Sequence, residues 1–236
     1  MISWDHPELK SSLEKRYGLG HQELAFKSLD SIFQNQDFSR YHYSEIDRLI
    51  SEHMTDKKSV KDYFRLVMST DANVKESEFI FRTSCKAHII SLLRHLHCAP
   101  DLLAHTIYYC LGFNLNDESF LEESKVTLYQ VKLILKQKSE YKSLLKLVNC
   151  LTNNDDYKYL QDWGNHTKHR ANVVPNLTYS LVSTGKDIYN FTFEAFSFKG
   201  REYPVESVMS FLNREYDRES EQIILIGMEI NKLVEK

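Results

Sequence analysis

Two clusters of polar residues carry the side chains of this sequence that are best suited to chemistry. Six of the ten histidines lie in residues 88–105 and 166–169. Imidazole, guanidinium and carboxylate groups brought together can bind phosphate, ligate a metal ion or transfer a proton, and the residue types leave all three open. The first cluster consists of Arg94, His97, Asp101 and His105, and the second of Asn165, Lys168, His169 and Arg170.

The first cluster lies on one face of a predicted helix, because successive residues turn by about 100° around a helix axis. This face can be the hydrated side of an amphipathic helix, although such a side usually carries Lys, Glu and Gln. It can also be a site in which Asp101 orients His97 while Arg94 faces an anion. A metal site is the third alternative, but the sequence has no H-E-x-x-H or E-x-x-H motif, so we expect no metal.

The second cluster closes a predicted helix over residues 155–170. Lys168, His169 and Arg170 fall in its last turn, where cations complement the exposed carbonyl groups, so capping of the helix explains them without any function. Asn165 is different, because asparagine is unfavourable inside a helix and normally needs a hydrogen bond there. We predict that His97, Asp101, Asn165 and His169 form one partly buried network, in which Asp101 raises the pKa of a histidine.

The composition favours helices as the elements that position these clusters. With only 7 Gly and 4 Pro in 236 residues, architectures rich in tight turns are disfavoured. Apolar residues at helical spacing predict helices over residues 7–17 and 21–34, then from Ser44 and over 57–69. In residues 76–111 the apolar residues lie on nearly every side of the helix axis, which predicts a buried central helix that Pro100 kinks or divides. Further helices are predicted from Ser119 to about 134, over 140–151 and over 155–170.

A strand pattern precedes the last helix. Tyr189, Phe191 and Phe193 alternate with polar residues, Lys199-Gly200 is a turn, and the change of parity at Ala195 suggests a bulge. Residues 177–182 are predicted to pair with this strand, and a long helix is predicted from Pro204 to about Val234. The fold class we predict is therefore mainly α: an antiparallel helical bundle with a small antiparallel β hairpin inserted before the C-terminal helix.

The remaining sequence features favour one soluble domain. We predict a single helical domain over 1–236, with N-terminal helices in 1–70, core helices in 76–175, a β insertion in 177–203 and a C-terminal helix in 204–235. A net charge of −3 gives no global attraction for nucleic acid or anionic membranes. The four cysteines show no C-x-x-C pair, which suggests free buried thiols. Without a leader or a long apolar run, we expect a cytoplasmic protein that does not bind membranes.

The run Asn165-x-x-Lys168-His169-Arg170 at a helix end, with His97 and Asp101 four residues apart in a preceding buried helix, resembles a group of bacterial HEPN-like proteins. The resemblance spans about residues 76–175. It implies a helical bundle, a homodimer, no cofactor, RNA or a cognate protein as partner, and a role in host defence as a metal-independent ribonuclease or an RNA-binding module. The hallmark of the catalytic members is an Arg followed four to six residues later by a His, and Arg170 has no such His after it.

The resemblance also suggests roles for the two clusters. The catalytic residues would be His97, Asp101, His169 and Arg170, with His97 or His169 transferring the proton, and the phosphate-binding or RNA-binding residues would be Arg94, Asn165 and Lys168. Two alternatives stay open. One is a non-catalytic helical interaction or ligand-sensing protein, in which the polar residues are a satisfied core network. The other is a metal-dependent hydrolase.

Overall fold

The protein is mainly α-helical, with a small antiparallel β region before the C-terminal helix. The computed structural model describes residues 3–55, 59–179 and 189–235, and the chain is 75% helical. The chain folds into two compact units. Unit 1 consists of Met1–Asp37, Leu96–Lys158 and Glu215–Lys236, and unit 2 of Phe38–His95 and Tyr159–Arg214. The predicted fold class is confirmed.

The first two helices begin close to their predicted starts, but the second is far longer than predicted. Helix α1 spans His6–Tyr17, and Asp5 caps it by accepting a hydrogen bond from the backbone N–H of Glu8 at 2.9 Å. Helix α2 then runs without a break over Leu19–Met54. The predicted end at 34–39 and the predicted new start at Ser44 are wrong. Asn35 and Ser39 are buried, so these polar residues lie on the inner face of a continuing helix and do not form a loop.

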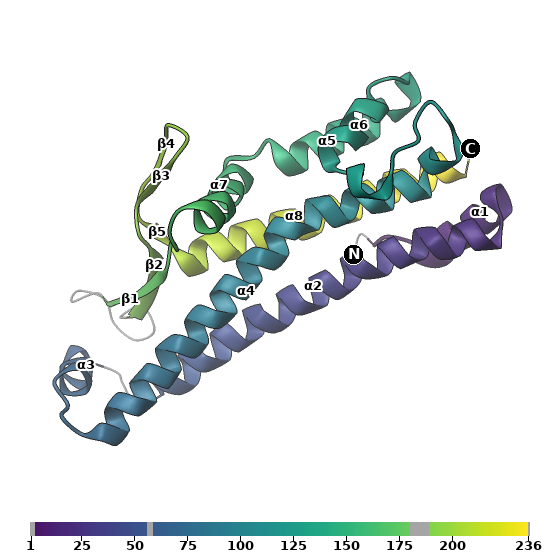
Figure 1. The fold of residues 1–236 in the computed structure, drawn as a ribbon. Coiled ribbons are helices and arrows are strands. Elements are labelled where there is room, and N and C mark those ends of the chain that lie inside the picture. Colours follow the sequence, from purple (N-terminus) through teal and green to yellow (C-terminus); the bar gives the residue numbers. More distant parts are fainter. Residues whose placement is uncertain (1–2, 56–58, 180–188, 236) are drawn as a thin grey trace. The chain divides into compact units, whose positions relative to one another are not determined.

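The central helix is also continuous. Helix α4 spans Ala72–Cys110 and contains Pro100, so the predicted division at this proline is wrong. Proline removes one backbone donor and crowds the preceding turn. On both sides of it the helix buries large apolar residues, including Leu96 and Leu103, and this packing keeps the two halves in one helix. In each unit α4 runs antiparallel beside α2 (Figure 1). In unit 1 the two helices are joined by a hydrogen bond between the His21 ring and the carbonyl oxygen of Tyr109, and in unit 2 by one between the rings of His42 and His88.

Unit 1 has its own apolar core, to which several shorter elements contribute. The predicted helix from Ser119 starts later, because η2 (Glu123–Lys125) precedes α5 (Leu128–Leu135), which Thr127 caps.

The other helices are close to their predicted bounds. Helix α6 (Lys142–Thr152) and α7 (Asp155–His169) agree with prediction, and α3 spans Val60–Val67. The C-terminal helix α8 spans Val208–Val234 and not Pro204 to Val234. The remaining short turns are η1 (Phe113–Leu115) and η3 (Ser139–Tyr141).

Unit 2 carries the strands. Strand β1 (Pro175–Tyr179) pairs antiparallel with β2 (Tyr189–Phe193), with Leu177 opposite Phe191, and β2 pairs on its other side with β5 (Glu206–Ser207). The predicted pairing of these two strands is confirmed, although residues 180–182 of the predicted strand lie outside the described residues. Strands β3 (Phe196–Phe198) and β4 (Arg201–Tyr203) form a separate hairpin. The bulge predicted at Ala195 is wrong, since the chain leaves one sheet there and enters another.

Two further expectations concern the surroundings of the protein. No helix within the described residues is long and apolar enough to cross a membrane. The four cysteines are free, but only Cys85 and Cys110 are buried, whereas Cys98 and Cys150 are exposed. The expectation of four buried thiols is therefore half wrong. Burial raises the pKa of the Cys85 and Cys110 thiols to about 12, so both stay protonated and unreactive.

Candidate functional site

The residues selected from the sequence divide between the two units. Asp101 and His169 are exposed, and His97 and Asn165 are half-buried. Because the two helices that carry them contribute these residues to different units, the single network of four residues stays a prediction. His97 and Asp101 lie in unit 1, and Arg94, Asn165, Lys168, His169 and Arg170 lie in unit 2.

In unit 2 the end of α7 presents its cations to solvent. The last backbone bond runs from the N–H of Arg170 to the carbonyl of His166 at 2.9 Å. The His166 ring then lies against the chain that leaves the helix, with Nδ1 at 2.9 Å from the carbonyl oxygen of Ala171. Lys168, His169 and Arg170 are exposed. The engaged histidine of this run is therefore His166, which was not selected from the sequence.

The β3–β4 hairpin meets the end of α7 through one aromatic ring. The guanidinium of Arg170 lies 5.2 Å from the centre of the Phe198 ring, and the ammonium of Lys199 lies 5.4 Å from it. Lys199 and Gly200 form the two-residue turn, both with positive φ (48° and 80°), and this turn places Lys199 beside the ring. Arg170 also makes a long contact of 3.5 Å to the carbonyl of Ser197. It therefore reaches the hairpin and does not cap its own helix.

The hairpin is fixed to α7 by a buried carboxylate. Asp162 is 1% exposed and accepts hydrogen bonds from Nη2 of Arg201 at 2.8 Å and from the Tyr203 hydroxyl at 2.7 Å. Arg201 and Tyr203 point to the same face of the hairpin because they are two residues apart in a strand. Phe196 and Phe198, opposite them in register, share this face. Asp162 thus ties the hairpin that carries Lys199 to the helix that carries the other exposed cations. We call Lys168, His169, Arg170 and Lys199 the basic surface of unit 2.

Unit 2 also contains three histidines in contact. Nδ1 of His42 lies 2.8 Å from Nδ1 of His88, and the His42 ring stacks on His95 with 5.6 Å between ring centres. Burial, followed by the neighbouring His88 and His95, lowers the pKa of His42, and burial lowers the pKa of His95. A hydrogen bond between two ring nitrogens requires one of them to lack a proton. This contact therefore requires that Nδ1 of either His42 or His88 carries no proton.

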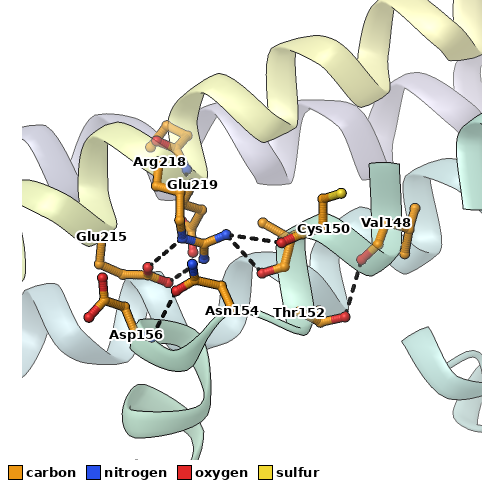
Figure 2. A network of polar contacts seen from close by, with 10 residues as sticks. Val148, Cys150, Thr152, Asn154, Asp156, Glu215, Arg218 and Glu219 are labelled. Carbon is orange, nitrogen blue, oxygen red and sulfur yellow. Dashed lines mark hydrogen bonds and ion pairs between the residues drawn. The ribbon is translucent and has the colours of Figure 1, made fainter. Parts of the chain in front are cut away.

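Unit 1 contains a buried ionic network that the sequence did not suggest (Figure 2). Arg218 donates to both carboxylate oxygens of Glu215, from Nη2 at 2.7 Å and from Nε at 2.8 Å. Its Nη1 donates to the carbonyls of Leu151 at 3.0 Å and Cys150 at 3.4 Å, at the end of α6. The guanidinium therefore ties α8 to the junction between α6 and α7. Glu219, one turn after Glu215, is buried beside this pair.

The network is rich in carboxylates and poor in cations. Burial, together with Glu215, raises the pKa of Glu219 well above its usual range. Burial lowers the pKa of Arg218, but the hydrogen bonds and charge of Glu215 outweigh it, so the Arg218 pKa is raised. Tyr157 is buried nearby, and its pKa is raised by burial and then by Asp101, Glu219 and Glu215. Asp101 thus acts on this network from α4.

These acidic groups do not make a metal site. In the part of the chain that the structure describes, no three His, Cys, Asp or Glu side chains are placed to hold a metal ion together.

The spacing of residues along α8 could have pointed to the ionic network. Val208, Leu212, Glu215, Glu219, Ile223, Ile226 and Ile230 follow one another at intervals of three or four residues along α8. Glu215 and Glu219 therefore occupy core positions of an otherwise apolar stripe.

No protein-family model, curated protein or solved structure matches this chain. The basic surface of unit 2 is exposed, and its four residues come from the end of α7 and from the β3–β4 turn.

Proposed function

We propose that the protein binds the phosphate backbone of RNA through the basic surface of unit 2. One observation carries this proposal: two cations, Arg170 and Lys199, lie over one ring, Phe198, and are exposed. Within the described residues neither is paired with a carboxylate. Exposed cations held in place by a common support can contact adjacent phosphates without losing much side-chain entropy.

The same geometry favours recognition of the backbone over recognition of bases. The Phe198 ring is only 6% exposed beneath its two cations, so it offers no face on which a base could stack. Lys168, Arg170 and Lys199 each carry a permanent charge that can replace counterions at a phosphate. Three such contacts predict that the logarithm of affinity falls with the logarithm of salt concentration with a slope of roughly −2 to −3. The net charge of −3 means that this attraction is local.

RNA is chosen over other polyanions because of the resemblance to HEPN-like proteins of host defence. In the catalytic form of the proposal, His169 transfers a proton while Arg170 and Lys168 stabilise the phosphate. Arg94 and Asn165, in the same unit, are further candidates for phosphate contacts. His97 and Asp101 belong to unit 1 and are not part of this basic surface.

The test is a titration of fluorescent RNA followed by anisotropy, with duplex and single-stranded RNA of equal length at about 50 and 200 mM salt. The variant Lys168→Ala/Arg170→Ala/Lys199→Ala should bind duplex RNA about tenfold more weakly or worse, with a smaller salt slope. The matched control is Lys136→Ala/Lys142→Ala/Lys146→Ala, which removes three exposed lysines of unit 1 and should bind as the wild type does. Equal affinity of all three proteins would refute the proposal.

Cleavage is tested in the same samples. Gel analysis of the RNA after incubation with wild type and His169→Ala separates the two forms of the proposal. Loss of cleavage with retained binding in the variant supports catalysis by His169. Intact RNA with both proteins, together with binding, leaves an RNA-binding module, and no binding at all leaves the non-catalytic interaction protein as the better explanation.

A further inference from the structure

Glu219 is a carboxyl group buried in unit 1 without a cation of its own. Its side chain lies in α8, and the residue is 0% exposed. Oε1 accepts one hydrogen bond, from Nε2 of Gln36 on α2 at 3.3 Å. Oε2 has no hydrogen-bond partner among the residues that the structure describes. An ionised carboxylate in such a place would be poorly compensated, because a neutral amide at this distance is a weak donor.

The nearby cation is committed elsewhere. Arg218 makes two hydrogen bonds to Glu215 and two to the carbonyls of Cys150 and Leu151. The bidentate bond to Glu215 uses the geometry that a guanidinium prefers, so one positive charge already neutralises one carboxylate. A charge on Glu219 would therefore leave two carboxylates and one cation in a buried region (Figure 2).

Among the described residues, the groups of other elements that contact this network or act on its charges are uncharged or acidic. Helix α2 contributes the neutral amide of Gln36, and α6 contributes only backbone carbonyls. The start of α7 contributes Tyr157 and Asp156, and α4 contributes Asp101, whose charge acts on Tyr157. Each of these ionisable groups is neutral or negative at neutral pH. Burial and the charge of Glu215 favour the uncharged form of Glu219, and they outweigh Arg218 and the hydrogen bond from Gln36, which favour the charged form.

We propose that Glu219 is held as a neutral carboxylic acid in the folded protein, and that its ionisation is a switch that loosens α8 from α2 and from the α6–α7 junction. Protonation is the less costly state, because a buried neutral carboxyl loses at most a hydrogen bond whereas a buried unpaired charge loses its hydration. The direction of the Glu219 pKa agrees with this geometry. This inference concerns unit 1 and does not depend on RNA binding.

The switch acts as pH rises. In the unfolded chain a glutamate loses its proton near its ordinary pKa of 4.5, whereas the folded protein keeps the proton on Glu219 to a higher pH. Between these two values only the folded state holds the proton. The equilibrium constant for unfolding should therefore rise with pH, by up to about tenfold per pH unit, and level off above the folded-state pKa.

The experiment measures urea unfolding of the full chain from about pH 5 to pH 9. The variant Glu219→Gln keeps the shape of the neutral acid and cannot ionise, so it should lack the decrease in stability that the wild type shows. The difference in free energy of unfolding between Glu219→Gln and the wild type should grow in favour of the variant as pH rises, and should be smallest at the acidic end of the range. The matched control is Glu221→Gln, which removes an exposed carboxylate on the same helix and should keep the wild-type profile.

Parallel pH profiles of wild type and Glu219→Gln would overturn the proposal. If the variant does not fold, the wild type decides alone, by ¹³C NMR titration of protein labelled at the glutamate carboxyl carbons. One carboxyl signal should then remain in the protonated form at neutral pH while the exposed glutamates titrate normally. If every glutamate signal titrates near the ordinary value, Glu219 is ionised in the folded protein and the switch does not exist.

Discussion

The indole ring of Trp4 packs directly on the backbone of Gly227. A Cβ atom at position 227 would overlap the six-membered part of the ring, so only glycine lets α8 come this near. The ring is also held by its Nε1, which donates to Oδ1 of Asn231 at 2.9 Å, one turn further along α8. Asn231 in turn donates to the carbonyl of Asp5 at 2.7 Å. The segment before α1 is therefore docked on α8 at a place that requires glycine.

Replacement of Gly227 should destabilise unit 1 despite a better helix propensity. Alanine at this position should gain about 1 kcal/mol of propensity, but it displaces the Trp4 ring, which costs roughly 1–3 kcal/mol or more. We expect a lower urea midpoint for Gly227→Ala and a blue- or red-shifted tryptophan emission. Gly20→Ala is the control, because nothing lies within 4 Å of a Cβ at that helical position. That variant should be neutral or more stable, and a similar loss in both would contradict the packing explanation.

Asp162 should determine whether the β3–β4 hairpin stays on α7. Asp162→Asn removes the charge that accepts hydrogen bonds from Arg201 and Tyr203, at a cost of about 1–3 kcal/mol. The amide protons of the hairpin should then exchange faster with solvent. Glu202→Gln, an exposed change in the same hairpin, is the control. Unchanged exchange in Asp162→Asn would show that the aromatic contacts alone hold the hairpin.

The three histidines of unit 2 should make this unit less stable in mild acid. The pKa values of His42 and His95 are lowered on folding, so below about pH 6.5 the unfolded chain binds protons that the folded one does not. The contribution of His42 and His95 to the stability of unit 2 should therefore be constant above that pH and decrease as pH falls. His42→Gln should reduce this decrease. The stability of unit 2 is measured by hydrogen exchange of the α2 and α4 amides at about pH 7.5 and 5.5, corrected for intrinsic exchange rates. Equal pH dependence in the wild type and His42→Gln would contradict the prediction.

Phe198 should contribute to RNA binding without touching RNA. Phe198→Leu keeps an apolar side chain in the hairpin but removes the ring that orients Arg170 and Lys199. Each cation–ring contact at an exposed site contributes about 0.5–1 kcal/mol and the variant removes two, so affinity should fall by up to roughly five- to thirtyfold. Anisotropy titration measures the change. Phe191→Leu, a buried change in β2, controls for general loosening of unit 2 and should leave the affinity closer to that of the wild type.

Local patterns predicted the parts of this fold that depend on neighbouring residues. The alternation around Phe191 predicted β2 and its pairing with β1, and Lys199-Gly200 predicted the turn, because period and turn chemistry are local properties. The separate β3–β4 hairpin was not predicted, since residues 196–198 were expected to continue the first strand. The helix end predicted at the polar segment 34–39 was wrong, because Asn35 and Ser39 are buried inside α2 once this helix packs on other elements. Pro100 misled for a similar reason. The free-energy cost of a proline inside a helix is smaller than the stabilisation that α4 gains by burying apolar residues on both sides of Pro100.

The candidate sites were predicted less well, because burial of a charge is decided by tertiary structure. Glu215, Arg218 and Glu219 lie in a segment that reads as a hydrated helix face, although two of them continue the apolar stripe of α8. Arg170 was selected from the sequence, but its position over Phe198 depends on a hairpin that begins more than twenty residues later. Sequence could identify the residue types and not the surfaces that they form.

Neither compact unit is a continuous stretch of chain, since α2, α4 and α8 each contribute residues to both. A truncation from either end therefore reaches unit 2 only after it has removed part of unit 1, and no single cut in a loop releases either unit whole. Neither unit can be copied, lost or transferred between genes as one uninterrupted block. An expression study of one unit alone would need a rearranged chain in which new linkers join segments that are distant in the natural order.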